Sequence, residues 1–207
     1  MTPTPQEFFK TPSNLRTFRI STSTDDLFVN IQFLAEYSEF FNIMLNGEFR
    51  EKQEMKATIP DVEADDLIDF LSFICPVNYK LNQVITESNI YNLLYFSDRL
   101  MCPFIKEHIK KWLIGNEFKA GTYTADVLVN SAVLLHTQGF GGAEMTPVFK
   151  KLGSMNLTQV SKTLDIIDPT IKAIFEEKIR VHTPYTFARR EPGNQWGDYD
   201  YRARIFF

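Results

Sequence analysis

The order of secondary-structure patterns from Asn14 to Leu113 constrains the fold of this chain more than any other feature. Residues 15–22 combine β-branched and aromatic side chains, and the polar run 23–26 supplies turn residues before a second apolar stretch, which predicts a β-hairpin. Apolar residues then recur at helical spacing until Asn46-Gly47, which favours a pair of helices that ends there. The predicted buried stripe of this pair is Leu34, Tyr37, Phe41 and Leu45.

One strand and three helices are expected to follow. Met55, Ala57 and Ile59 alternate with polar residues, which indicates a strand with one buried face. A helix then ends before Pro76, and Thr86 can cap the next one. The helical residues that we expect to face the core are Leu67, Phe70, Leu71, Ile74, Ile90, Leu93, Leu94, Ser97, Ile105, Ile109, Trp112 and Leu113.

Four short segments, at residues 33–41, 47–51, 59–62 and 93–100, occur in an order and spacing typical of one family. On these segments, residues 14–115 resemble a BTB/POZ domain, and the resemblance covers about half of the chain. It implies an α+β fold in which a small sheet is flanked by a cluster of helices. It also implies a protein that binds other proteins and catalyses no reaction.

The resemblance further implies a homodimer, because BTB domains usually dimerise through the first strand and the helices after it. Phe33, Phe40 and Ile43 lie off the predicted buried stripe and would otherwise expose an apolar patch. The chain departs from the family at 29–32, where many members carry a basic residue or histidine, and at Asn14, where many have Asp. The residues predicted at the dimer interface are Phe18, Ile20, Phe33, Phe40 and Ile43.

Many family members bind the cullin-3 scaffold of a ubiquitin ligase. Such adaptors carry a hydrophobic residue, any residue and then Glu just after the second helix of the pair, and Phe49-Arg50-Glu51 stands at that position. We therefore predict that Phe49 contacts cullin-3 and that Glu51 orders the loop by accepting hydrogen bonds. The alternative is a surface loop with an incidentally exposed Phe.

The size and charge of the chain limit the other possibilities. With 207 residues, 44% of them hydrophobic, it can hold one good core and a smaller appendage. Its net charge of −4 and scattered basic residues argue against direct binding of nucleic acid. Residues 1–13 lack a secretory signal and are expected to be flexible, and no apolar run approaches the roughly 20 residues of a membrane span. We expect a soluble protein of the cytoplasm, the nucleus or both.

The sequence offers no catalytic or cofactor site. His108, His136 and His182 have no Cys or carboxylate at metal-ligand spacing around them. Cys75 and Cys102 lie in apolar helical contexts, so we expect buried free thiols, with a disulfide or a metal site as the alternatives. We therefore expect no enzyme activity, no metal and no cofactor.

Residues 120–181 are expected to form a helical extension after a connector at 116–121. Thr124 can cap a helix that stops at Gly139, Asn156 can cap a second, and Asp168-Pro169 opens a third. Their apolar faces are too narrow for a separate core, so these helices should pack on those before them. The extension loosely resembles the BACK segment that follows many BTB domains.

The last segment, residues 182–207, holds seven aromatic residues in 26 positions, whereas aromatic residues make up 14% of the chain. Alternation of apolar and charged residues over 199–207 predicts a half-buried strand that adds to a sheet edge of this chain, its dimer mate or a partner. The alternative is a disordered tail. The predicted partner-binding residues are Trp196, Tyr199, Tyr201, Ile205 and Phe207.

The resemblance to BTB domains implies three possible functions. The first is a homodimeric BTB adaptor that recruits a protein substrate to a cullin-3 ubiquitin ligase. The second is a dimeric scaffold that links partners without any ligase and uses the C-terminal segment to bind them. The second stays open because no propeller repeats, zinc fingers or second β-rich domain are recognisable in the sequence. The third is a small adaptor that bridges a cullin to separate substrate receptors, because such adaptors share the fold that the resemblance implies and are similarly small.

Overall fold

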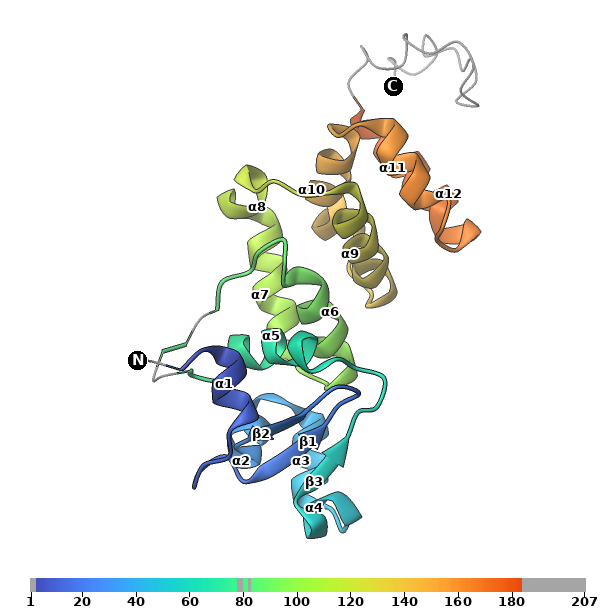
Figure 1. Ribbon diagram of the computed structural model, residues 1–207. Helices are drawn as coiled ribbons and strands as arrows, with labels where there is room; N and C mark the ends of the chain where they lie inside the picture. Colours follow the sequence, from blue (N-terminus) through green and yellow to red (C-terminus); the bar gives the residue numbers. More distant parts are fainter. Residues whose placement is uncertain (1–2, 78–79, 82, 184–207) are drawn as a thin grey trace, which may run out of the picture.

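A three-stranded sheet forms one end of the molecule (Figure 1). The computed structural model describes residues 3–77, 80–81 and 83–183. The central strand β1 (Phe18–Ser21) runs antiparallel to β2 (Asp26–Val29) and parallel to β3 (Lys56–Thr58). In this register Ile20 lies opposite Leu27 on one side and Ala57 on the other. The predicted hairpin is confirmed.

The predicted helix pair consists of α2 (Ile31–Tyr37) and α3 (Glu39–Asn46), which end at Gly47 as expected. Ser38 separates them, since it ends α2 and its hydroxyl caps α3 by accepting the Phe41 N–H at 3.2 Å. This break shifts the helical register. Leu34 and Phe41 are therefore buried as predicted, while Met44 is buried more deeply than Leu45 and Tyr37 is partly exposed.

The N-terminal residues that we expected to be flexible instead form α1 (Pro5–Lys10). Thr4 and Glu7 make a reciprocal capping box at its start, which satisfies two backbone N–H groups. The helix packs on β2 and α5, with Phe9 only 1% exposed. Burial of the Phe9 ring stabilises this helix, and the polar, Pro-rich residues at its start gave no sign of that burial.

Helices complete this part of the chain: α4 (Arg50–Glu54), α5 (Ala64–Ile74), α6 (Ile90–Arg99), α7 (Pro103–Ile114) and α8 (Asn116–Ala120). Every residue that we expected to face the core from α5, α6 and α7 is buried. Cys75 and Cys102 are buried free thiols, as predicted. Burial raises the pKa of Cys75 to about 12 and that of Cys102 to about 11, which keeps both unreactive.

Three local predictions were wrong. Met55 is not part of the strand, because it ends α4 in a left-handed conformation (φ 52°) with its side chain partly exposed. Thr86 does not cap α6; Asn89 occupies that position, and its side chain accepts the Thr86 N–H at 2.8 Å. The expected connector at 116–121 contains α8, because Phe118 is buried against Trp112 and Tyr123.

The C-terminal extension contains α9 (Ala125–Thr137), α10 (Gly142–Gly153), α11 (Leu157–Leu164) and α12 (Pro169–His182). Thr124, Asn156 and Asp168 cap α9, α11 and α12, as predicted. The sequence did not predict α10, which has Pro147 in its interior. Its buried residues outweigh that local cost: Met145, Val148, Phe149 and Leu152.

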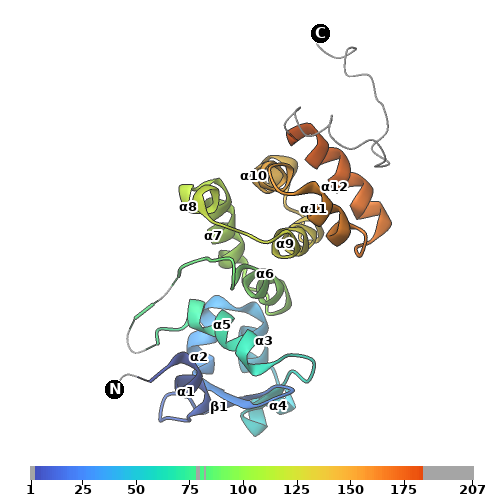
Figure 2. The same ribbon diagram turned by 45° about the horizontal axis from the view of Figure 1, so that its top comes forward.

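The helices stack as successive pairs, α6 with α7, α9 with α10, and then α11 and α12 (Figures 1 and 2). In this stack α9 packs on α6 and α10 packs on α7, while α11 packs on α9 and α12 packs on α10. One hydrophobic core therefore runs from the sheet into the extension. The prediction that the extension packs on the preceding helices is confirmed.

Candidate protein-binding surfaces

An aromatic side chain protrudes at the corner between α3 and α4. Gly47 ends α3, and Phe49 precedes the first residue of α4 with its ring 47% exposed. A Cβ placed on Gly47 would lie 2.3 Å from Cε2 of Phe49, so only glycine leaves room for the ring in this position. The corner thus presents a large apolar side chain in a position that the glycine beside it leaves open.

We predicted that Glu51 orders a loop by accepting hydrogen bonds, and the structure does not show this role. The segment after Phe49 is the helix α4 and not a loop, and within the described residues the Glu51 carboxylate makes no hydrogen bond or ion pair. Glu51 lies in the first turn of α4, where a negative charge interacts favourably with the helix dipole. Its carboxylate is half-buried and remains available to a partner.

Two of the predicted dimer-interface residues, Phe18 and Ile20, lie in the core and not at the surface. The side chains of Phe18 and Ile20 are 0% exposed because they fill the core of their own chain, so they cannot contact a second subunit. The alternation of inward- and outward-facing residues along the strand correctly predicted that both side chains are buried. The prediction was wrong about what covers that face.

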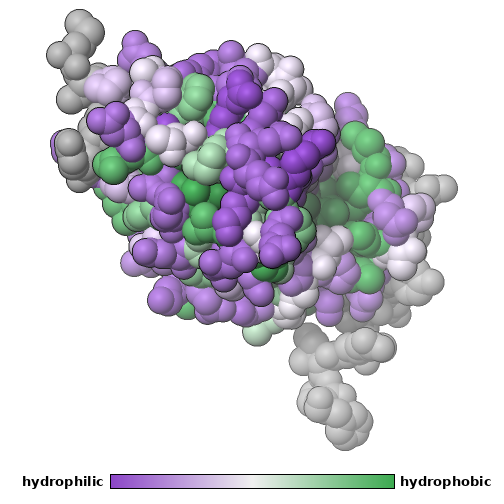
Figure 3. Space-filling model, turned by 90° about the horizontal axis from the view of Figure 1, so that it is seen from below, coloured by the Kyte–Doolittle hydropathy of each residue, from purple (hydrophilic) through white to green (hydrophobic). Residues whose placement is uncertain are grey.

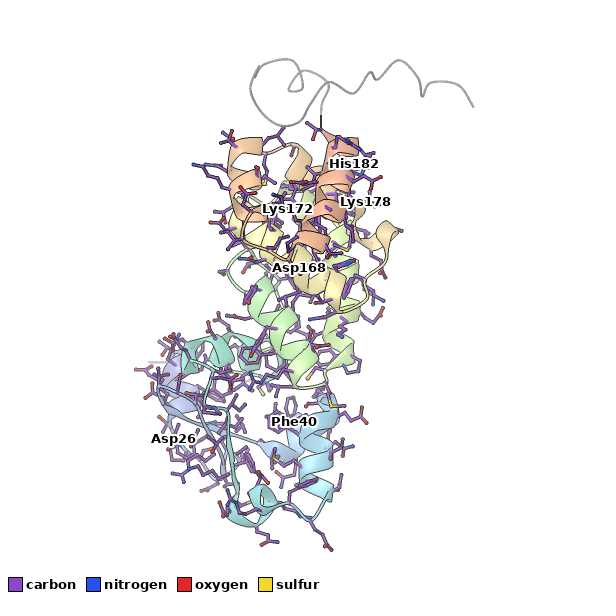
Figure 4. The ribbon with its side chains drawn as sticks, turned by 90° about the vertical axis from the view of Figure 1, so that its right-hand side faces the viewer. Asp26, Phe40, Asp168, Lys172, Lys178 and His182 are labelled. Carbon is purple, nitrogen blue, oxygen red and sulfur yellow. The ribbon has the colours of Figure 1, made fainter. Side chains whose placement is uncertain are left out.

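The other three predicted interface residues reach the surface of the helix pair. Ile43 is 47% exposed, and Phe33 and Phe40 are half-buried. Phe40 lies on α3, across the domain from Asp26 (Figure 4). The ring of Phe33 lies 5.0 Å from that of Tyr37, which in turn lies 5.3 Å from Phe104 of α7. An aromatic surface therefore extends from α2 to the start of α7.

A buried hydrogen bond fixes this surface to the helices above it. The Ser38 hydroxyl donates to the Leu100 carbonyl at 2.5 Å, and the Glu39 N–H donates to the Met101 carbonyl at 3.1 Å. Both bonds join the α2–α3 corner to the α6–α7 turn. Sequence reasoning missed Ser38, because a serine between two helices reads as a cap and gives no sign of a second, distant partner.

The family model described as BTB/POZ domain matches residues 15–117. These residues form a BTB/POZ domain. The three-stranded sheet, the helix pair and the helical cluster are its elements, and the helices from α9 to α12 extend it. A BTB domain is a module for protein–protein interaction, so the exposed aromatic surfaces are the candidate binding sites.

Curated relatives from Caenorhabditis elegans share the domain. The chain is 36% identical over 86 residues to BTB and MATH domain-containing protein 36, and this match covers 42% of the chain and 26% of the relative. It is 25% identical over 111 residues to BTB and MATH domain-containing protein 38, and this match covers 54% of the chain and 28% of that relative. The matches thus span about a quarter of the length of these relatives.

Two earlier predictions stay untested. The family match covers residues 15–117 and so does not test the resemblance of α9 to α12 to a BACK segment, whereas the structure establishes the helical extension itself. The predicted partner-binding residues of the C-terminal segment lie outside the described residues: Trp196, Tyr199, Tyr201, Ile205 and Phe207.

The described part of the BTB protein shows no group of three or more His, Cys, Asp or Glu side chains arranged to hold a metal ion. Within the same residues, no helix has both the length and the apolar character needed to cross a membrane. Figure 3 views the molecule from its sheet end, where hydrophobic residues reach the surface in separate patches among hydrophilic ones.

Proposed function

We propose that this chain is a homodimeric adaptor that recruits a substrate protein to a cullin-3 ubiquitin ligase. The observation that carries the proposal is the exposed ring of Phe49 at the α3–α4 corner, in a position that is open because Gly47 has no side chain. A large apolar ring that is only half-covered by its own chain suits an anchor that a partner protein buries. Glu51 lies two residues after Phe49, in the first turn of α4, and its half-buried side chain supplies a polar contact to the same partner.

The homodimer is supported by a separate surface. Ile43, Phe40 and Phe33 of the helix pair expose apolar area, and a second copy of the chain would cover it. The Phe49 corner follows the C-terminal end of α3, whereas Phe33 lies on α2 and Phe40 in the first turn of α3. We propose that one chain binds its mate and a cullin at the same time.

The experiment is affinity purification of the tagged chain from cells, with identification of the proteins that co-purify. Wild type and Phe49→Ala are compared, and Glu48→Ala serves as the matched control because Glu48 is an exposed neighbour. We expect cullin-3 with wild type and Glu48→Ala and its loss with Phe49→Ala. Recovery of other partners without any cullin from all three variants would favour the ligase-free scaffold.

A further inference from the structure

A groove lies between α8 and α10. Both helices are remote from the α4 corner (Figure 1). The volume of the groove is about 340 Å³. The side chains of three lysines and two hydroxyl residues border it, together with an aromatic ring and a proline: Phe118, Lys119, Thr146, Pro147, Lys150, Lys151 and Ser154. None of the described residues that line the groove carries a carboxylate. The groove is therefore a cationic site on a chain whose net charge is −4.

Lys151 makes structural contacts beside this groove. Its ammonium group donates to the carbonyls of Lys119 and Gly121 at 2.8 and 2.6 Å, and it lies 5.2 Å from the centre of the Tyr123 ring. These contacts satisfy the carboxyl end of α8 and fasten it to α10. They also fix a positive charge in the lining of the groove.

Lys119 and Lys150 make no such contacts through their ammonium groups within the described residues. Both side chains are exposed, and neither makes an ion pair or a hydrogen bond through its ammonium group within the described part of the chain. Each lies in the last turn of its helix, where a cation offsets the helix dipole, but Lys151 already satisfies the end of α8. The two lysines from different helices are thus free to bind an anionic group between them.

By its charge, the C-terminal segment of the chain is a poor candidate for that anionic group. Residues 184–207 contain four arginines and three acidic residues, which gives them a charge of +1. Charge complementarity therefore favours a foreign occupant.

We infer that the α8–α10 groove is a docking site for an acidic peptide segment of a partner protein. Lys119 and Lys150 pair with its carboxylates, Pro147 and the lysine stems contact an apolar side chain between them, and the hydroxyls of Thr146 and Ser154 border the bound segment. This site is separate from the Phe49 corner, so its occupation does not require a cullin.

The test measures binding of a fluorescein-labelled peptide, Asp-Glu-Leu-Asp-Glu, to the full chain by fluorescence anisotropy at low salt. The double variant Lys119→Gln, Lys150→Gln is compared with Lys162→Gln, Lys178→Gln, which removes the same charge from exposed positions on α11 and α12 (Figure 4 labels Lys178). Two lost ion pairs at a partly covered site should weaken binding about tenfold in the groove variant, and less than about twofold in the control.

Equal weakening in both double variants would overturn the inference, since it would show attraction by net charge alone. Absence of wild-type binding would also overturn it, as would equal affinity for the Asn-Gln-Leu-Asn-Gln peptide. Tighter binding of single-stranded RNA or of vesicles with anionic lipids, lost in the groove variant, would replace the acidic peptide with that ligand. Circular dichroism of each variant confirms that the fold is retained.

Discussion

Arg99 holds Asp61 through two parallel hydrogen bonds of 2.7 Å each. The pair joins the segment after β3 to the end of α6, and the guanidinium also lies over the Tyr95 ring. This fork-to-fork geometry is the strong form of a charged hydrogen bond. It connects the sheet of the BTB domain to its helical cluster.

The Asp61–Arg99 pair predicts a pH dependence of stability. The hydrogen bonds from Arg99 lower the pKa of Asp61 below its usual value of about 4. A carboxylate with a lowered folded-state pKa stabilises the protein above its unfolded-state pKa, and that contribution is lost as the pH falls through the folded-state value. Asp61→Asn should therefore unfold at lower urea concentration than wild type at pH 7, with the difference shrinking below about pH 4. A difference that is constant with pH would contradict this assignment.

Gly47→Ala should weaken cullin-3 binding although it removes no contact atom. The new Cβ would meet the Phe49 ring at 2.3 Å and the Ile43 carbonyl at 2.9 Å, so the ring must move from its observed position. We expect about tenfold weaker binding, measured by biolayer interferometry. Gly142→Ala is the control, because a Cβ there meets nothing within 4 Å. Equal affinity of Gly47→Ala and wild type would show that the Phe49 position is immaterial.

The dimer surface is tested at Ile43, whose side chain is 47% exposed on α3. Ile43→Lys places a charge in the proposed interface, where burying it without a partner is costly. Light scattering should give about twice 24.0 kDa for wild type and about 24.0 kDa for the variant. Ile166→Lys, at an 84% exposed position in the extension, should remain dimeric. A wild-type chain that is monomeric at tens of micromolar would refute the homodimer.

Ser131 provides a test of the core where the extension meets the domain. Its hydroxyl is buried and lacks a hydrogen-bond partner among the described residues, beside a small void lined by Trp112 and Leu113. Ser131→Ala should raise the free energy of unfolding by about 1 kcal/mol, because it removes an unsatisfied buried polar group. Ser97→Ala should lower it by about 1 kcal/mol, because that hydroxyl donates to the Leu94 carbonyl at 2.9 Å. Urea denaturation measures both, and a loss of stability in Ser131→Ala would contradict the account.

The sequence allowed most helices of the domain to be predicted, because period and caps are local properties. The stripe from Leu67 to Ile74 and the caps at Thr124 and Asp168 depend only on near neighbours, and all were correct. The helix α10 was missed since its stability comes from burial of Val148 and Phe149 by α7, α9 and α12, a long-range effect that outweighs Pro147.

The candidate site was harder to predict for the same reason. Alternation showed that Phe18 and Ile20 have a buried face but could not show whether their own chain or a second subunit covers it. The pattern around Phe49 located an exposed aromatic residue, whereas the role of Gly47 depends on the direction of the ring in space. The groove between Lys119 and Lys150 joins residues 31 positions apart, so no local motif marks it.

Direct titration of the purified chain with the N-terminal half of cullin-3 tests the central claim. Isothermal titration calorimetry should show saturable binding at one cullin per chain. Phe49→Ala should weaken that binding roughly thirtyfold, since truncation of a buried aromatic anchor costs about 2 kcal/mol, whereas Glu48→Ala should change it little. No binding by the folded wild-type chain, or unchanged affinity in a folded Phe49→Ala variant, would contradict the account.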